Sequence, residues 1–336
     1  MKGYLLRRLL FMVVGWWLLS VVVFIVIQLP PGDYLTTYIA GQEQAGTFLE
    51  REEIESLKLY YGLDKTPFEQ YIYWAGRFVT GDLGRSFGSW RSAEQPVTKI
   101  LAEVLPMTII LSTLSLLFTY AVAVPIGIYS ATHQYKLGDY FFTTIGFIGL
   151  AIPNFMLALL MMYFFFQAFG ISAGGLFSPE YALADWSLEK LWDMICHLWV
   201  PVVVLGTAGT AGIMRVMRGV LLDELGKQYV ITARARGVSE KRLLFKYPVR
   251  LSLNPIVSSI GYILPGIFSG NAIVAIVLSL PMTGPVLLTA LLAQDMFLAG
   301  SIIMVEGALV IFGTFLSDIL LAVVDPRIRQ ERAMTG

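Results

Sequence analysis

Six long stretches of this chain contain almost no charged side chain, and they restrict the fold more than any other feature. The only charges inside them are Glu306 and Asp318, both in the last stretch. A helix crosses the hydrocarbon core of a bilayer with about 20 apolar residues, so each stretch is long enough to span a membrane. We therefore predict an all-α membrane protein with six transmembrane helices. The stretches cover residues 9–29, 104–135, 140–169, 194–214, 251–280 and 296–324.

The composition favours one membrane domain over two soluble domains, because 56% of the residues are hydrophobic and only 14% are charged. The single cysteine, Cys196, excludes an intramolecular disulfide, and no Cys/His cluster has metal-ligand spacing. The first apolar stretch resembles a signal peptide, but no small-residue cleavage site follows it, and LPPGD at residues 29–33 is typical of a span exit. We predict that this segment is retained as the first transmembrane helix.

The distribution of basic residues predicts the orientation of the spans. With the N-terminus inside, the inner segments hold 16 of the 24 Lys and Arg residues, and the outer loops hold 16 of the 24 acids. Loops on the cytoplasmic side are enriched in Lys and Arg. Both termini are therefore predicted to lie in the cytoplasm, the N-in/C-in arrangement.

A basic segment at residues 215–250 holds nine Lys and Arg residues between two apolar stretches. We predict one helix from Asp223 to Arg236 and a left-handed stop at Gly237. Ser239 is then placed to cap a second helix that begins at Glu240. The small side chains of Ala233 and Ala235 leave room for a docking partner, so this segment predicts a compact helical elbow in the cytoplasm.

The loop after the first span also has the signals of two helices. Thr47 and Glu50 form a capping box for a helix that ends near Gly62, and the sequence Thr66-Pro67-Phe68-Glu69 caps a second helix that breaks at Gly81. The second helix carries many apolar side chains. We expect an extracytoplasmic cap that lies on the membrane mouth or faces a partner; the alternative is a surface loop packed on itself.

Motifs of catalysis are missing from the sequence. It contains no GxxxxGK[ST], GxSxG, HExxH or CxxC pattern, and Cys196 and His197 point about 100° apart on a helix. We expect no catalytic residue and no nucleic-acid partner. If transport is driven by ATP, the nucleotide is hydrolysed on another chain.

Polar groups inside a span are functional candidates because their burial in lipid is costly. Glu306 lies about ten residues into the last span, and Asn271 lies in the fifth. We predict that both line a translocation pathway. The alternatives for Glu306 are an internal hydrogen bond or a pair with another subunit. The glycines of the pattern Gly206-x-x-Gly209-x-x-Gly212 are expected to pack helices closely, within the subunit or between subunits.

The stretch Ile231-Thr232-Ala233-Arg234-Ala235-Arg236-Gly237 resembles the cytoplasmic loop of ABC importer permeases, which carries Glu-Ala-Ala, three residues and Gly. The glutamate is absent here, as it is in the dipeptide/oligopeptide branch, whose usual form is YVxTARAxG. Further stretches similar to that branch lie along nearly the whole chain. They are YLLRRLL (4–10), LPPGD (29–33), YGLD (61–64), GDLGRSF (81–87) and DPRIR (325–329).

This resemblance implies the type I ABC importer transmembrane fold in a bacterial cytoplasmic membrane. It also implies a homologous second permease, two ATPase subunits that bind ATP and Mg²⁺, and an extracytoplasmic solute-binding protein, with no cofactor on this chain. The implied ATPase-coupling residues are Thr232, Ala233, Arg234, Ala235, Arg236, Gly237, Ser239 and Glu240. The expected organisation is a first span (1–29), an outer loop (30–98), a five-helix core (99–325) with its coupling loop (221–250), and a tail (326–336).

The implied function is import of short peptides by alternating access. Similar permeases carry oligosaccharides, nickel or glutathione, so these substrates stay open as alternatives. Two other classes also remain, namely a proton-coupled secondary transporter that uses Glu306 and Asp318, and a membrane assembly subunit without a transport path.

Overall fold

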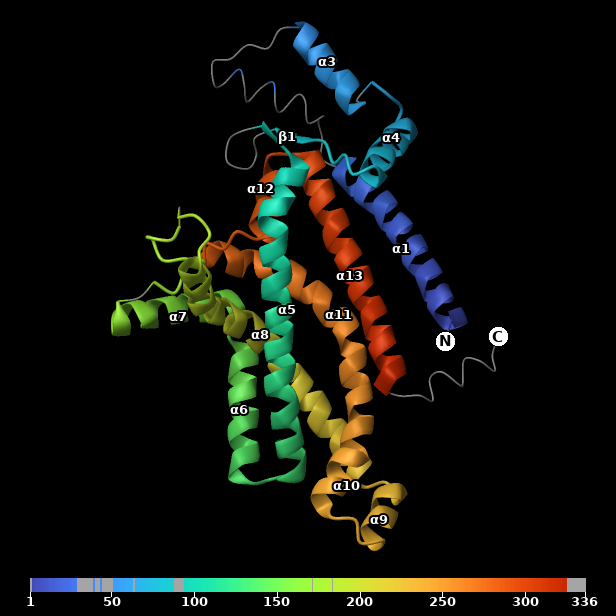
Figure 1. The fold of residues 1–336 in the computed structure, drawn as a ribbon, viewed down its shortest axis with the longest axis vertical. Coiled ribbons are helices and arrows are strands. Elements are labelled where there is room, and N and C mark those ends of the chain that lie inside the picture. Colours follow the sequence, from blue (N-terminus) through green and yellow to red (C-terminus); the bar gives the residue numbers. More distant parts are fainter. Residues whose placement is uncertain are drawn as a thin grey trace. The chain divides into compact units, whose positions relative to one another are not determined.

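The computed structural model describes residues 2–28, 39, 43, 51–62, 64–87, 94–170, 172–182 and 184–324. The chain divides into two compact units, each treated by itself below. Unit 1 holds residues 109–280 and 312–336, and unit 2 holds residues 2–108 and 281–311. Figure 1 shows that helices make up nearly all of the described chain. The all-α prediction is therefore correct except for one short β-ribbon in unit 2.

Four helices are long and apolar enough to cross a membrane: Arg7–Gln28, Val97–Thr132, Leu188–Leu225 and Met296–Leu321. A fifth candidate is the pair α6 (Leu137–Ala151) and α7 (Asn154–Phe169). The remaining predicted span, the fifth along the chain at residues 251–280, falls largely in the 30-residue helix α11 (Pro248–Val277), in which the side chains of residues 261–262 and 264–271 lie outside the described set. The number six, like the orientation, thus stays a prediction.

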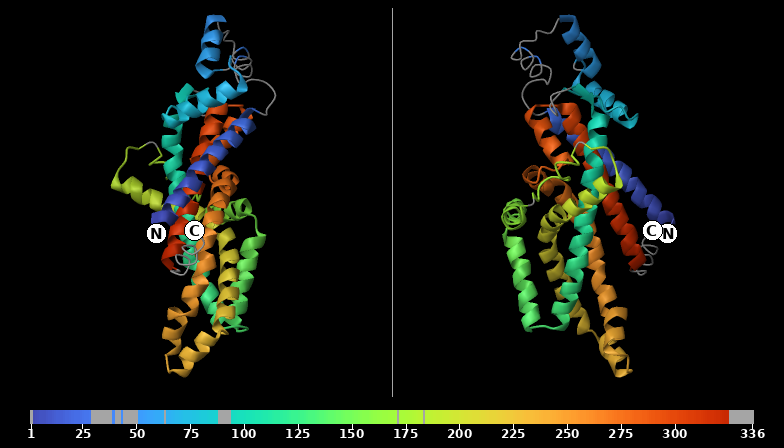
Figure 2. Two further views of the ribbon diagram at one scale, coloured as in Figure 1. Left: turned by 90° about the vertical axis from the view of Figure 1, so that its right-hand side faces the viewer. Right: turned by 60° about the vertical axis from the view of Figure 1, so that its left-hand side comes forward.

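The span predicted over residues 140–169 is broken into two helices. Helices α6 and α7 meet at 103°, and both views of Figure 2 show α7 turned away from the axis of α6. The bend lies at Ile152 and Pro153, whose ψ angles of 121° and 138° are extended. Proline lacks the N–H that the helix needs and disfavours helical geometry in the residue before it, so the helix stops here.

Unit 1 is built around α8 (Leu188–Leu225), which packs against α6, α7 and α11 and touches the later part of α5 (Val97–Thr132). Glycines make the closest approaches. A Cβ atom on Gly206 would lie 2.5 Å from the Phe118 ring, and one on Gly146 would lie 2.7 Å from Met214 Cε. Thr119 Oγ1 donates a hydrogen bond of 2.9 Å to the carbonyl of Gly206. Within this unit, Gly206 and Gly209 therefore pack α8 on α5, while a Cβ on Gly212 would meet nothing within 4 Å.

Unit 2 contains α1 (Lys2–Gln28), α3 (Arg51–Tyr61), α4 (Pro67–Val79), the start of α5, α12 (Thr283–Leu292) and the first part of α13 (Met296–Val324). Its β-ribbon pairs β1 (Arg85–Phe87) with β2 (Glu94–Pro96) in antiparallel register. Ser86 Oγ donates a hydrogen bond of 2.5 Å to the fully buried Asp295, which also accepts from the Leu298 N–H at 3.2 Å. The GDLGRSF stretch thus anchors the ribbon to the beginning of α13.

The two predicted loop helices are present as α3 and α4. Helix α3 ends before Gly62, which has φ 65°, while Thr47 and Glu50 lie outside the described residues. At the start of α4, Glu69 Oε2 accepts hydrogen bonds from Thr66 N at 3.0 Å and Thr66 Oγ1 at 2.8 Å. These two bonds hold the pKa of Glu69 below its usual value. The predicted cap and the predicted stop near Gly81 are confirmed.

Candidate functional site: a basic elbow and an intramembrane carboxylate

The basic elbow, residues 226–247, lies at one end of unit 1, where α8 leads through two short helices into α11 (Figure 1). The predicted single helix from Asp223 to Arg236 is wrong. Helix α8 runs on to Leu225, Lys227 is extended with ψ 148°, and α9 covers Gln228–Ala235. One extended residue rotates the following helix away from the preceding axis. The elbow therefore has two corners rather than one.

The second corner is a complete glycine stop. Gly237 has φ 77°, as predicted, and its N–H donates to the carbonyl of Arg234 at 3.0 Å. The Val238 N–H reaches back to the carbonyl of Ala233 at 3.3 Å. These two bonds form a Schellman motif, which satisfies carbonyls that the end of α9 would leave open.

Helix α10 covers Glu240–Lys246, so Ser239 occupies the predicted cap position. Its side chain makes no capping hydrogen bond, and this part of the prediction is wrong. An ion pair closes the corner instead. Arg234 Nε lies 2.5 Å from Glu240 Oε1, and Arg234 Nη2 lies 3.1 Å from Glu240 Oε2. The hydrogen bond from Arg234 lowers the pKa of Glu240, because it favours the ionised carboxylate.

Buried side chains tie both short helices to the rest of unit 1. Val230 on α9 and Leu243 on α10 have no exposed surface. Tyr229 donates a hydrogen bond of 2.5 Å to Glu224 at the end of α8. Burial and this carboxylate raise the pKa of Tyr229 well above its usual value. The elbow is thus firmly attached to α8 and α11, and the Tyr229–Glu224 contact was not predicted.

The outward surface of the elbow combines the predicted residues with two apolar side chains. Thr232, Arg234, Ala235, Arg236, Gly237, Ser239 and Glu240 are exposed, and Ala233 is half-buried. Ile231 and Phe245 are exposed by 48% and 54%. Their exposure was not expected, although the position of Phe245 close to three basic residues, Lys241, Arg242 and Lys246, is a usable signal. Large exposed apolar side chains between charges are typical of a protein interface.

Glu306 lies on α13 in unit 2, and its carboxylate accepts a hydrogen bond from a hydroxyl group. Thr283 Oγ1, at the start of α12, donates to Glu306 Oε1 at 2.5 Å. The Thr283 N–H donates to Thr108 Oγ1 at 2.9 Å, and both threonines are 1% exposed. The internal hydrogen bond that we weighed for Glu306 is therefore present. Asn271 lies on α11, and its side chain is outside the described set.

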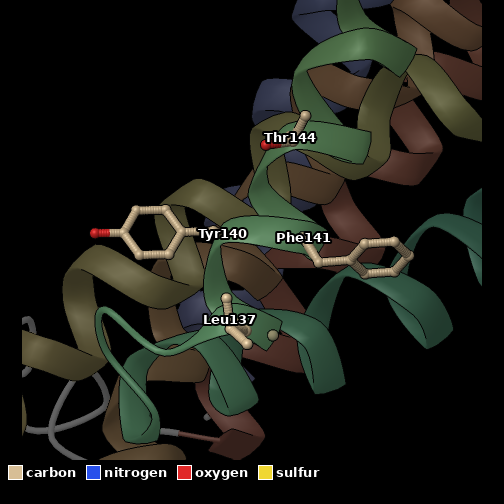
Figure 3. Close-up of a pocket in the computed structure, with 5 residues that line it drawn as sticks. Leu137, Tyr140, Phe141 and Thr144 are labelled. Atoms are coloured by element: carbon tan, nitrogen blue, oxygen red, sulfur yellow. The ribbon is translucent and has the colours of Figure 1, made fainter.

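Elsewhere in the described part of the chain, neither the α6 pocket nor the acidic, histidine and cysteine side chains form a catalytic or metal site. The pocket in Figure 3 is an open hollow on one face of α6, lined by Leu137, Gly138, Tyr140, Phe141 and Thr144, with no charged group. Among the described residues, no three His, Cys, Asp or Glu side chains are arranged to hold a metal ion. The described residues therefore define a class, a polytopic helical membrane protein with a basic elbow exposed between two long helices.

Comparison with known proteins gives the family. Residues 123–330 match the family described as binding-protein-dependent transport system inner membrane component. The chain is 31% identical over 332 residues to the oligopeptide transport system permease protein AppB of Bacillus subtilis (strain 168), covering 98% of this chain and 99% of that protein. It is 28% identical over 332 residues to the dipeptide transport system permease protein DppB of Lactococcus lactis subsp. cremoris (strain MG1363), covering 98% and 100%. The chain belongs to this family, and it is an inner-membrane permease component.

Proposed function

We propose that this chain is the permease subunit of an ATP-driven, binding-protein-dependent importer of short peptides. The observation that carries the substrate class is the 31% identity to an oligopeptide permease across 98% of the chain. A third relative, the oligopeptide permease OppB of Haemophilus influenzae, is 28% identical over 330 residues and covers 98% of this chain. No structural observation favours oligosaccharide, nickel or glutathione transport.

The proposed topology has six spans with both termini in the cytoplasm. Four long apolar helices, the broken pair α6–α7 and the length of α11 support it. Single cysteines at Gln70 and Lys241, in a Cys196→Ser background, test it. A membrane-impermeant thiol reagent applied to spheroplasts is expected to label the cysteine at position 70 and to label the one at position 241 only after permeabilisation. The reverse order would overturn the orientation.

The proposed partners are a second homologous permease, two ATPase subunits that hold ATP and Mg²⁺, and an extracytoplasmic binding protein. We assign the elbow, with Thr232 to Gly237, Ser239 and Glu240, as the surface that docks on an ATPase subunit. Its exposed Ile231 and Phe245 suit an apolar groove, and its arginines suit acids at the rim. No catalytic residue is assigned to this chain, since nucleotide hydrolysis takes place on the partners.

The mechanism follows from how the elbow is attached. Val230, Leu243 and the Tyr229–Glu224 bond fix α9 and α10 to α8 and α11, so a push on the elbow moves both long helices. ATP-driven closure of the ATPases would thereby favour the outward-open arrangement. A partner shifts such an equilibrium only through contacts that differ between the two states. The elbow offers those contacts at its exposed face.

Gly237→Val is the decisive variant. A Cβ there meets nothing within 4 Å, so the cost is the left-handed backbone itself, about 1–2 kcal/mol for a residue other than glycine. The glycine stop should distort, and uptake in reconstituted vesicles should therefore fall. Insertion of the chain into the membrane should be unchanged. The matched control is Gly226→Ala, because Gly226 has an ordinary φ of −82°. Gly237→Asn should restore much of the uptake, since Asn tolerates this conformation. Normal uptake by Gly237→Val would remove the coupling assignment.

Glu306 and Asn271 are proposed to line the translocation pathway. The support is the position of a carboxylate within a span, half-buried and held by Thr283. Glu306→Gln keeps an oxygen acceptor for Thr283 but removes the charge. If the charge meets the substrate, uptake of charged peptides should change more than uptake of neutral peptides. A uniform loss for all peptides would leave only the structural role.

A further inference from the structure

Helix α4 packs along the span α1, not beyond its end. Figure 2 shows α4 near the C-terminal end of α1, at an angle to it. The contacts extend from Gln28, the last residue of the candidate span Arg7–Gln28, to Trp16 near its middle. They are the hydrogen bonds Gln28–Gln70 at 2.9 Å and Ser20–Tyr71 at 2.9 Å, and the ring contacts Phe24–Trp74 at 5.9 Å and Trp16–Phe78 at 5.8 Å.

The packed side of α4 is only half of its apolar surface. With 3.6 residues per turn, Phe68, Ile72 and Val79 fall on one stripe next to the packed side. These three side chains are exposed by 73%, 54% and 74%, whereas Trp74 on the packed side is 8% exposed. We call Phe68, Ile72 and Val79 the α4 stripe. It is a row of large apolar side chains that no residue in the described part of unit 2 covers.

The polar side of α4 carries its own partners. Lys65 Nζ lies 4.1 Å from the centroid of the Tyr73 ring, and Arg77 Nη2 lies 2.7 Å from Asp82 Oδ2. Tyr73 and Arg77 fall on the side of the helix away from the α4 stripe. The helix therefore has a wide apolar arc and a separate charged arc, which is the pattern of a helix that lies in a membrane interface.

We propose that the α4 stripe contacts the lipid bilayer at the membrane face where α1 ends, so that α4 is an interfacial helix and not a cap surrounded by water. The lipid surface is continuous with α1, whose Val22 and Ile25 are exposed by 55% and 53% beside the same contacts. A helix packed on this part of a span meets the same lipid. The proposal rests on the membrane location of the chain and does not depend on the transported solute.

A protein partner is the competing occupant, and the size of the stripe argues against it. Three side chains at this exposure offer roughly 300–400 Å². A stable protein–protein interface buries about 800 Å² on each partner and includes hydrogen bonds. The stripe is narrow and has no polar atom. A bilayer needs neither a wide surface nor directional groups, and the charged arc keeps partners of its own, since Arg77 pairs with Asp82 and Lys65 lies over the Tyr73 ring.

Fluorescent labels on single cysteines test the proposal in the assembled transporter, reconstituted in vesicles that contain brominated lipids. The variants are Phe68→Cys, Ile72→Cys and Val79→Cys, each in a Cys196→Ser background. Val22→Cys on α1 is the lipid-facing control, and Lys65→Cys, at an exposed position just before α4, is the water-facing control. Labels on the α4 stripe should be quenched by brominated lipid as strongly as the label at position 22. Their quenching by aqueous iodide should be at least about threefold weaker than at position 65.

Two results would overturn the proposal. Strong iodide quenching at all three stripe positions, with little quenching by lipid, would place the stripe in water. Protection from both quenchers would mean that a protein covers it. Three positions are used so that one poorly assembled variant does not decide the result. The test measures quenching and not uptake. Failure of this proposal can therefore be distinguished from failure of the assignment of peptides as the substrate.

Discussion

Two ion pairs in unit 1 use the same chemical groups in opposite surroundings. At the elbow, Arg234 and Glu240 have side chains exposed by 50% and 67%. Between α8 and α6, Arg218 Nη2 lies 3.0 Å from Asp139 Oδ2, with side chains exposed by 29% and 4%. Asp139 also accepts hydrogen bonds from Arg218 Nε at 3.2 Å and from the N–H of Tyr135 at 3.1 Å.

The contrast in exposure shows which contacts hold the elbow and which hold α6 against α8. An exposed pair gains little because water screens it and two long side chains lose freedom. A buried pair is costly to break, because removal of one partner leaves the other charge without compensation. The elbow therefore takes its shape from Gly237 and the buried Val230 and Leu243, while the α6–α8 joint depends on its charges. The same contrast between buried and exposed copies of one residue type recurs at glycines and threonines.

The largest effect is expected for Asp139→Ala. It leaves Arg218 without its carboxylate in a mostly buried site, a change that typically costs about 3–5 kcal/mol. We expect a clear drop in the thermal unfolding midpoint of the purified complex. Asp185→Ala, at an exposed position, is the control and should leave the midpoint unchanged. Equal effects of the two variants would mean that burial does not distinguish these acids.

Gly206→Ala sharpens the comparison on a single helix. The new Cβ would lie 2.5 Å from Phe118 Cδ1 and 3.1 Å from the backbone oxygen of Ser115, so α8 and α5 must separate. Overpacking of this kind costs about 1–3 kcal/mol. Gly212→Ala is the matched control, since a Cβ there meets nothing within 4 Å. Thermal unfolding of both variants should show a loss only for Gly206→Ala, and a similar loss for both would contradict the packing.

Thr283→Val removes the hydroxyl that serves the Glu306 carboxylate while keeping the size of the side chain. A buried acceptor that loses its donor costs about 1–3 kcal/mol. Thr289→Val on the same helix is the control, because the Thr289 hydroxyl bonds only to carbonyls of α12 at Pro285 and Val286. The thermal unfolding midpoint should fall more for Thr283→Val than for Thr289→Val. A combined Thr283→Val, Glu306→Leu variant should recover part of the loss, and no recovery would mean that the two groups are not coupled.

The smallest effect is expected for Glu240→Gln at the exposed elbow, where stability near neutral pH should be unchanged within error. The lowered pKa of Glu240 means that the folded state favours its ionised form. Any stabilisation by the pair is therefore present above the usual glutamate pKa, about 4.3, and is lost as the pH falls below that value. The stability of the wild type and of Glu240→Gln should converge in acid. A large gap at neutral pH would show that the exposed pair does hold the elbow.

Several parts of the fold and of the candidate site were predictable because their signals are local. The stop at Gly237, the end of α3 at Gly62 and the cap of α4 depend on residues within one helical turn of each other. The break at Lys227 was missed, because nothing in the sequence near Gly226 distinguishes a continued helix from a corner. The 103° bend at Pro153 was missed because the apolar run continues through it without a charge.

The sequence alone was enough to predict which segments are apolar, that Gly62, Gly81 and Gly237 end helices, and the family to which the chain belongs. Those properties depend on side-chain chemistry within a few residues. Only the tertiary structure decided the partners, Asp139 with Arg218, Thr283 with Glu306, and Ser86 with Asp295. These pairs are 79, 23 and 209 residues apart in the chain. Hydrophobic periodicity says which face of a helix is buried, but the packing of whole helices decides which polar group that face will meet.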